Sequence, residues 1–134
     1  MNYWLVKSEP FKYSWKQFLK DKKAVWDGVR NYAARNNMRA MKKGDIVFFY
    51  HSNEGLEIVG YAKVVKEAYQ DPTTNETAWV VVEIAPVKSL KKPVSLAAIK
   101  EDVILKEMEM IRLNRLSVSP VREIEYHRII ELGF

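Results

Sequence analysis

The chain has 134 residues, which corresponds to about one domain spanning residues 1–134. Its 48% hydrophobic and 29% charged residues indicate a globular protein with a core and a soluble surface, and its formal net charge of +5 favours an anionic partner. Because it contains no cysteine, the sequence excludes disulfides, thiolate metal sites and a thiol nucleophile.

The N-terminal segment predicts a strand followed by a short helix. Residues 2–6 are aromatic and β-branched, which is typical of a strand, and Pro10 closes the segment after it. Ser14 is a suitable N-cap for the helix. Apolar side chains follow at helical spacing, namely Trp15, Phe18 and Leu19. We expect Trp15 to lie in the core.

A second strand and helix follow. Residues 24–26 predict a short strand, and Asn31 is a suitable N-cap for a helix from about Tyr32 to Met41. Arg35 and Arg39 are four residues apart and therefore share one face of this helix.

The middle of the chain predicts three strands close together. Residues 46–50 form a continuous apolar run, which indicates a strand buried on both faces. Gly60, inside the next strand, indicates a bulge or a sharp bend. The remaining expectations are a strand at 57–65, a loop at 69–75 and a strand at 78–84 whose end is restricted by Pro86.

The C-terminal part is mainly helical. Ser95 caps a predicted helix over about 96–101, and residues 103–116 are amphipathic and partly helical. Residues 117–121 are extended, and the last helix covers 122–132. Together the elements predict an α+β fold, in which helices surround a curled, mainly antiparallel sheet or small barrel.

The segment from Trp26 to Met41 combines aromatic, amide and cationic side chains. Aromatic faces suit a nucleobase, amides suit its hydrogen-bonding edge, and guanidinium groups suit phosphates. The alternative is a loop followed by a surface helix whose charges are only solvated. The side chains in question are Trp26, Arg30, Asn31, Tyr32, Arg35, Asn36, Asn37 and Arg39, followed by Lys42 and Lys43.

Two predicted strands end in polar residues. Lys7, Ser8 and Glu9 follow the first strand, and His51-Ser52-Asn53 follows the strand at 46–50. A rigid sheet holds such strand ends in place, so these groups could bind the polar edge of a ligand. The alternative is that Ser8 and Glu9 only cap the next turn.

Catalytic and targeting motifs are absent from the sequence. The two histidines, His51 and His127, lack metal-ligand spacing, and no dinucleotide or ATP loop occurs. A triad of Ser8, His51 and Asp27 can be written, but no nucleophile-elbow glycines surround Ser8. We therefore expect no catalytic residue, metal or cofactor.

With no signal peptide and no apolar run near the roughly 18 residues of a membrane span, we expect a cytoplasmic protein, nuclear in a nucleated cell, with no membrane partner.

Five segments resemble one family. The sequences YWLVKSEP, WDGVRNYAARNNMRAMKKGD, FFYHSN, IVGYAKVVKEAYQDPT and RLSVSPV together are similar to the EVE domain, a member of the PUA-like superfamily that is distantly related to the YTH domain. The resemblance covers about residues 2–132. It implies a PUA-like pseudo-barrel with a pocket for a modified or flipped nucleobase in DNA or RNA, and it points to cytosine with a C5 substituent.

The resemblance also implies site residues. It places Trp26 against the base, the first strand end at the edge of the base, and Arg115–Val121 at one side of the pocket. Two departures are a short loop at 69–77 and Ser119 at a position where Gln is common. The implied base-binding residues are Lys7, Ser8, Glu9, Trp26, Asp27, Asn31, Tyr32, His51, Ser52, Ser117 and Val118, and the expected phosphate-binding residues are Arg30, Arg35, Arg39, Lys42, Lys43 and Arg115.

Three functions remain open at this point. The first is a non-catalytic module that binds a modified base. The second is an amidohydrolase that acts on a modified nucleoside, as in the ASCH type of PUA-like protein, with Lys7 activating a nucleophile and Glu9 moving a proton. The third is a protein-interaction module with a vestigial cavity. The sequence leaves open the modification, the choice between DNA and RNA, and the oligomeric state.

Overall fold

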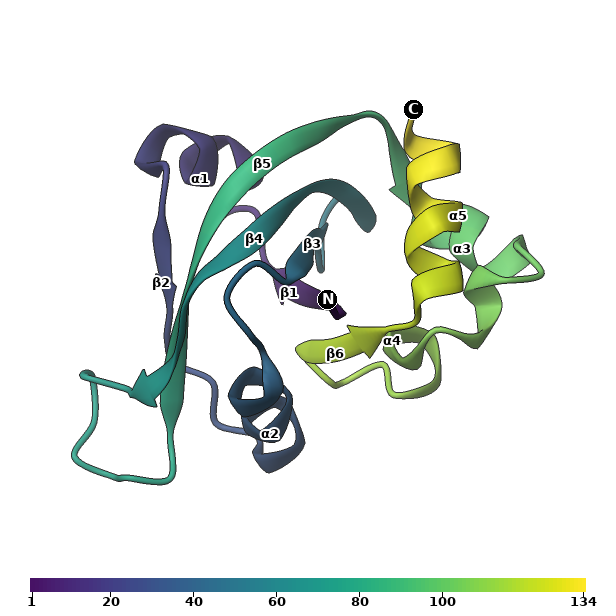
Figure 1. Cartoon of the computed structure of the whole chain (residues 1–134). Helices are drawn as coiled ribbons and strands as arrows, with labels where there is room; N and C mark the ends of the chain where they lie inside the picture. Colours follow the sequence, from purple (N-terminus) through teal and green to yellow (C-terminus); the bar gives the residue numbers. More distant parts are fainter.

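A curled six-stranded sheet, in the order β2-β5-β4-β3-β1-β6, forms the centre of the computed structural model, which describes residues 1–134 (Figure 1). β1 and β3 are parallel, and all other neighbours are antiparallel. The edge strands β2 and β6 do not pair, so the sheet is not closed into a barrel. The strands are β1 Tyr3–Ser8, β2 Ala24–Trp26, β3 Ile46–His51, β4 Glu57–Gln70, β5 Val80–Ser95 and β6 Val118–Val121.

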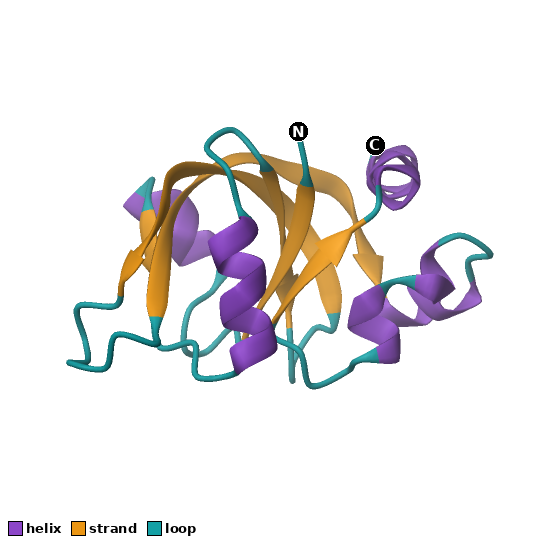
Figure 2. Cartoon of the chain, turned by 60° about the horizontal axis from the view of Figure 1, so that its bottom comes forward, coloured by secondary structure: helices purple, strands orange, loops and turns teal.

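Helices surround the sheet, as predicted. α3, α4 and α5 lie together on one side of the molecule, and α1 and α2 lie away from them (Figures 1 and 2). No helix is long and apolar enough to cross a membrane. The helices are α1 Trp15–Asp21, α2 Tyr32–Ala40, α3 Leu96–Glu101, the 3-10 turn η1 Leu105–Glu107, α4 Glu109–Arg112 and α5 Glu123–Gly133.

Three helix starts follow the predicted capping chemistry. The side chains of Ser14, Asn31 and Ser95 each accept a hydrogen bond from a backbone N–H in the first turn of α1, α2 and α3, at 3.0, 2.9 and 3.1 Å. Each cap satisfies one of the N–H groups that a helix start leaves without a partner. These three predictions are confirmed.

β4 and β5 are longer than predicted, and they form the long bent hairpin of the sheet. β4 continues to Gln70, so the prediction of a loop from Tyr69 is wrong in its first two residues. β5 continues past Pro86, which was expected to end it. Pro86 pairs with Ala62 beside a shift of register, and such a bulge accommodates a residue that has no N–H to donate.

Gly60 is a point of close approach as well as an irregular position. The β3–β4 and β4–β5 registers both shift next to it, as predicted for a bend glycine. A Cβ at Gly60 would lie 2.3 Å from Cζ2 of Trp15, whose indole N–H donates to Ser89 Oγ at 2.8 Å. Trp15 is buried, as predicted, whereas Leu19, assigned to the same stripe, is 42% exposed.

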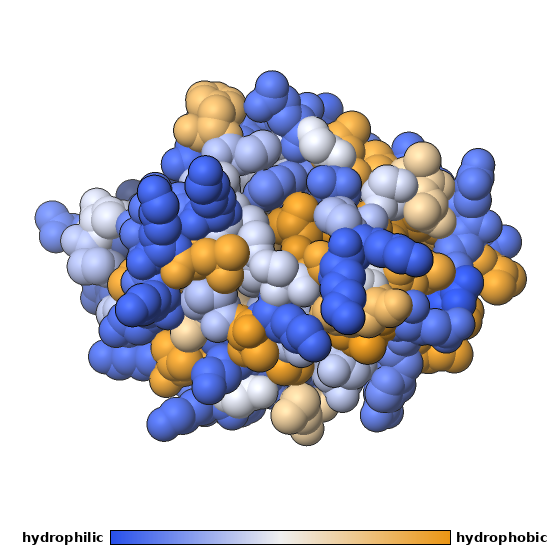
Figure 3. Space-filling model, turned by 90° about the horizontal axis from the view of Figure 1, so that it is seen from above, coloured by the Kyte–Doolittle hydropathy of each residue, from blue (hydrophilic) through white to orange (hydrophobic).

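Two apolar clusters lie on the two faces of the sheet. One contains Trp15, Phe18 and Phe49 and packs beneath α1 and α2. The other contains Phe48 and Ile129 and packs beneath the C-terminal helices. The face in Figure 3 is largely hydrophilic, with hydrophobic side chains scattered among the charged ones.

The parallel pair of β1 and β3 positions the strand ends. Lys7 lies opposite Tyr50, and Ser8 lies opposite His51. Because the two strands run in the same direction, both polar segments predicted at strand ends meet at one edge of the sheet.

Candidate functional site

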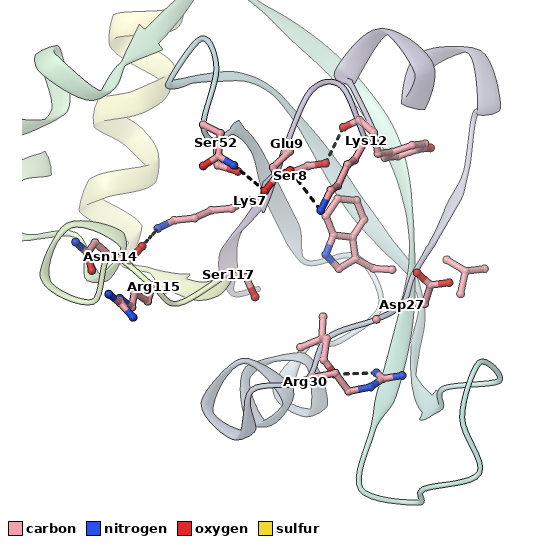
Figure 4. A pocket seen from close by; sticks show the side chains of 16 residues that line it. Lys7, Ser8, Glu9, Lys12, Asp27, Arg30, Ser52, Asn114, Arg115 and Ser117 are labelled. Atoms are coloured by element: carbon pink, nitrogen blue, oxygen red, sulfur yellow. Dashed lines mark hydrogen bonds and ion pairs between the residues drawn. The ribbon is translucent and has the colours of Figure 1, made fainter.

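A cavity of about 610 Å³ lies at this edge of the sheet. The segment after β1 bounds it on one side, the β2–α2 segment faces it, and the loop before β6 closes a third side (Figure 4). The curl of the sheet brings the end of β2 across from the end of β1. The lining residues are Lys7, Ser8, Glu9, Lys12, Tyr13, Val25, Trp26, Asp27, Gly28, Val29, Arg30, Ser52, Asn53, Asn114, Arg115 and Ser117.

Trp26 is a half-buried wall of the cavity. Its ring packs edge-on against Phe49, at a centroid distance of 5.7 Å, and against Tyr13, at 6.2 Å. Three of the four tryptophans in the chain donate their indole N–H to a side-chain oxygen, whereas the Trp26 N–H has no partner within the protein. One part of Trp26 is therefore fixed by the core, while its remaining surface and its N–H are left for a ligand.

Asp71, in the β4–β5 loop, fixes the β2–α2 segment. Its buried carboxylate accepts hydrogen bonds from the Gly28 N–H and from the Arg30 guanidinium, each at 3.0 Å. The N–H and the hydroxyl of Thr73 donate to its other oxygen, and these donors hold the pKa of Asp71 well below its usual range despite burial. The short β4–β5 loop thus holds the cavity wall that contains Trp26.

Lys7 points from β1 toward the loop before β6 (Figure 4). Its backbone N–H donates to the Ser117 carbonyl at 2.9 Å, and its ammonium donates to the Asn114 carbonyl at 2.9 Å. No carboxylate pairs with the ammonium, and burial lowers the pKa of Lys7. Lys7 therefore links two walls of the cavity through one neutral contact.

Ser8 and Glu9 line the cavity, and they also close the turn into α1. The Ser8 hydroxyl donates to the Tyr13 carbonyl at 2.6 Å, so that its proton is already used. The Glu9 carboxylate accepts from the Asn53 amide at 2.6 Å and lies 3.4 Å from the Lys12 ammonium. These contacts agree with the alternative that Ser8 and Glu9 close the next turn. The Ser8 hydroxyl oxygen can still accept a hydrogen bond from a ligand.

Several polar groups of the cavity have no partner in the protein. These are the Asp27 carboxylate, the hydroxyls of Ser52 and Ser117, and the Arg115 guanidinium. The lining set contains four cations against two carboxylates, which makes the cavity favourable for an anionic ligand that carries a hydrogen-bonding edge. No group of three or more His, Asp or Glu side chains that could hold a metal ion is present.

Four predicted base-binding residues do not line the cavity. His51 Nε2 accepts from the Trp15 N–H at 3.1 Å, and burial lowers the pKa of His51. Asn31 caps α2, and Val118 is fully buried in β6. Tyr32 is 60% exposed and packs on Trp79 outside the cavity, with its ring centroid 4.9 Å away.

Of the six predicted phosphate-binding cations, two line the cavity and four lie outside it. Arg30 and Arg115 line the cavity, although Arg30 is paired with Asp71. Arg35 donates to the Ala78 carbonyl at 3.1 Å. The exposed cations outside the cavity that form no ion pair are Arg39, Lys42 and Lys43.

Sequence reasoning did not assign Lys12 or Asp71 to the site. Lys12 belongs to the turn after β1, and its position three residues beyond Glu9 was the available signal. Asp71 had no local signal, because its partners Gly28 and Arg30 are more than 40 residues away in the chain.

Comparisons with known proteins agree with the fold over the whole chain. The EVE domain family model matches residues 2–132. Mouse thymocyte nuclear protein 1 is 38% identical over 165 aligned residues, covering 98% of this chain and 73% of that protein.

Two solved structures are close to this one. A protein from Agrobacterium tumefaciens has a TM-score of 0.96 and 47% identity, over 99% of this chain and 93% of that chain. Human THYN1 protein in complex with DNA containing 5-methylcytosine has a TM-score of 0.91 and 34% identity, over 99% of this chain and 98% of that chain.

A more distant neighbour bears on the fold alone. An ASCH protein from Zymomonas mobilis has a TM-score of 0.65 and 13% identity over 99% of this chain and 96% of that chain. The predicted α+β, PUA-like architecture with a curled mixed sheet is confirmed by these similarities.

Proposed function

The chain belongs to the EVE domain family, and we propose that it is a non-catalytic module that binds DNA carrying a modified base, namely cytosine with a C5 substituent. The observation that carries this proposal is Trp26, which lies half-buried in the cavity wall and keeps its indole N–H free. The likeness to a structure that holds 5-methylcytosine DNA supports the choice of ligand.

The free groups of the cavity match the chemistry of a cytosine. Stacking on the Trp26 ring contributes about 1–3 kcal/mol for a base. The free Asp27 carboxylate can accept from the exocyclic amino group of cytosine, which is the pairing that acidic side chains make with this base. The hydroxyls of Ser52 and Ser117 can donate to its carbonyl oxygen or ring nitrogen.

A base in a duplex has to leave its stack to reach this cavity. That step costs a few kcal/mol, and it costs least at a mismatched, damaged or single-stranded position. Lys12 and Arg115 line opposite sides of the cavity, and we expect them to contact the phosphates that flank an extruded nucleotide. The exposed cations of α2 and the segment after it extend the positive surface.

The contacts of Lys7 and Glu9 argue against the hydrolase alternative. The Lys7 ammonium is bound to the Asn114 carbonyl, and the Glu9 carboxylate is occupied by Asn53 and Lys12. No histidine lines the cavity, since His51 faces Trp15. Both residues that this alternative requires are therefore engaged in other contacts, and no histidine is available in the cavity as a general base.

The test is a binding measurement with matched oligonucleotides. Fluorescence anisotropy at fixed salt compares DNA and RNA strands, single and duplex, that differ only in one cytosine or 5-methylcytosine. We expect DNA with the modified base to bind tightest and Asp27→Ala to weaken that binding by about tenfold or more, the loss of one charge-assisted hydrogen bond. Glu101→Gln, a change at an exposed carboxylate outside the cavity, is the control.

Two results would contradict the proposal. One is equal affinity for all bases, with no effect of Asp27→Ala. The other is release of an altered nucleoside, detected by mass spectrometry after incubation with the modified strand, because a binding module leaves its ligand unchanged.

A further inference from the structure

Phe11 is a large apolar side chain that the fold leaves in solvent. It is 75% exposed, whereas Phe18, Phe48 and Phe49 are fully buried. It belongs to neither of the two apolar clusters and does not pack at the margin of either one. Phe11 therefore contributes little to the core, and its ring is available to a binding partner.

The turn that carries Phe11 is held firmly. The Glu9 carbonyl accepts hydrogen bonds from the N–H groups of Lys12 and Tyr13, at 3.0 and 2.9 Å. Pro10, the second residue of this turn, has its φ fixed by its own ring. Because the turn is already ordered, little conformational entropy is lost when a ligand contacts its exposed ring.

This turn lies at the edge of the cavity. Glu9 and Lys12, which precede and follow Phe11 in the chain, both line the cavity, whereas Phe11 does not (Figure 4). The Lys12 ammonium is exposed and lies 3.4 Å from the Glu9 carboxylate. One rigid turn beside the cavity thus presents a cation, which suits a phosphate, and an apolar ring, which suits the face of a base.

A base that enters the cavity from a duplex leaves a gap behind it. The nucleotide turns about its own backbone, so the vacated position in the stack stays close to the cavity that holds the base. Proteins that open or kink a duplex insert apolar side chains, such as Phe, Leu, Ile or Met, between its base steps. An exposed phenylalanine on a rigid turn beside the cavity has the chemistry and the place for this insertion.

We propose that Phe11 enters the base stack of a DNA duplex and occupies the position that the extruded base leaves. The ring then stacks on the neighbouring bases and offsets part of the cost of unstacking, while Lys12 contacts the adjacent phosphate. This inference rests on the proposed function. It goes beyond that function because it assigns the binding of duplexes, as distinct from single strands, to a residue outside the cavity.

The test compares a duplex with the single strand of the same sequence, each carrying one 5-methylcytosine. A single strand needs no extrusion, so we expect Phe11→Ala to weaken duplex binding at least fivefold and single-strand binding less than twofold. Phe11→Leu keeps apolar bulk and should retain more duplex affinity than Phe11→Ala. The matched control is Val103→Ala, a change at an apolar residue that is 73% exposed and lies outside the cavity lining; it should alter neither affinity.

Each outcome decides the inference. If Phe11→Ala weakens both probes equally, the ring contacts a base of the bound strand and does not fill a gap in the duplex. If it changes neither, or if Phe11→Leu binds the duplex no better than Phe11→Ala, the insertion is also overturned. In these cases the modified DNA is still bound, so the proposed function survives; absence of binding to both probes by the unmodified protein would overturn that function itself.

Discussion

Replacing Trp26 by Ala separates a binding role from a core role. A fully buried Trp loses about 3–5 kcal/mol of folding free energy on this change. Trp26 is half-buried and contacts Phe49 and Tyr13 through part of its ring, so we expect about half that loss, roughly 2 kcal/mol. Losing a stacked base costs about 1–3 kcal/mol, which corresponds to a roughly fivefold to 150-fold weaker affinity.

The assay pairs urea unfolding with anisotropy on the same protein samples. Trp26→Phe, which keeps an aromatic face and loses the free N–H, is expected to retain part of the affinity. Trp4→Phe is the control, because Trp4 is buried at the start of β1 and donates to Asp45 at 3.0 Å. It should lower stability and leave binding intact. A loss of 3–5 kcal/mol in Trp26→Ala with unchanged affinity would refute the stacking role.

Three further predictions use the contacts of the site. Lys12→Ala should reduce the slope of log affinity against log salt by about one phosphate contact, whereas Lys92→Ala, an exposed lysine of β5, should not; an equal slope in both removes Lys12 from the phosphate contacts. Because the pKa of Asp71 is lower in the folded protein than in the unfolded chain, its stabilisation is complete above about pH 4 and is lost as the pH falls further. Asp71→Ala should therefore lower the free energy of unfolding by about 3 kcal/mol near pH 7. It should also reduce the loss of stability that the protein shows on acidification below about pH 4, and an unchanged loss in the variant would contradict this. Ser8→Ala should cost about 1 kcal/mol of stability by removing the bond to the Tyr13 carbonyl, and a larger effect on base selectivity than on stability would restore Ser8 as a reader of the base edge.

The parts of the fold that the sequence predicts well are those with local causes. Ser14, Asn31 and Ser95 cap helices through their own side chains, and the glycine at position 60 makes room for Trp15. The lengths of β4 and β5 were not predicted, because the bulges that keep Pro86 in the sheet arise from pairing between strands.

The candidate site is predicted only in part, because some of its contacts have local causes and others depend on distant segments. Parallel strands bring Ser8 and Ser52 together, and this follows from the two strand-end motifs. His51 was assigned to the site with them, yet successive side chains of a strand face opposite sides, and its ring faces Trp15 instead. Asp71 could not be found from sequence, since its partners come from a distant turn.

The hydrogen bonds by which Asp71 holds the β2–α2 segment have an evolutionary consequence. Asp71 is the first residue of the β4–β5 loop and lies outside the cavity lining, and exposed loops are where insertions and deletions are tolerated most readily. Changes there can shift the Trp26 wall without altering any residue that a ligand touches. Selectivity can therefore diverge between relatives whose cavity linings are identical, and lengthening or shortening this loop offers a route to changing the ligand preference by design.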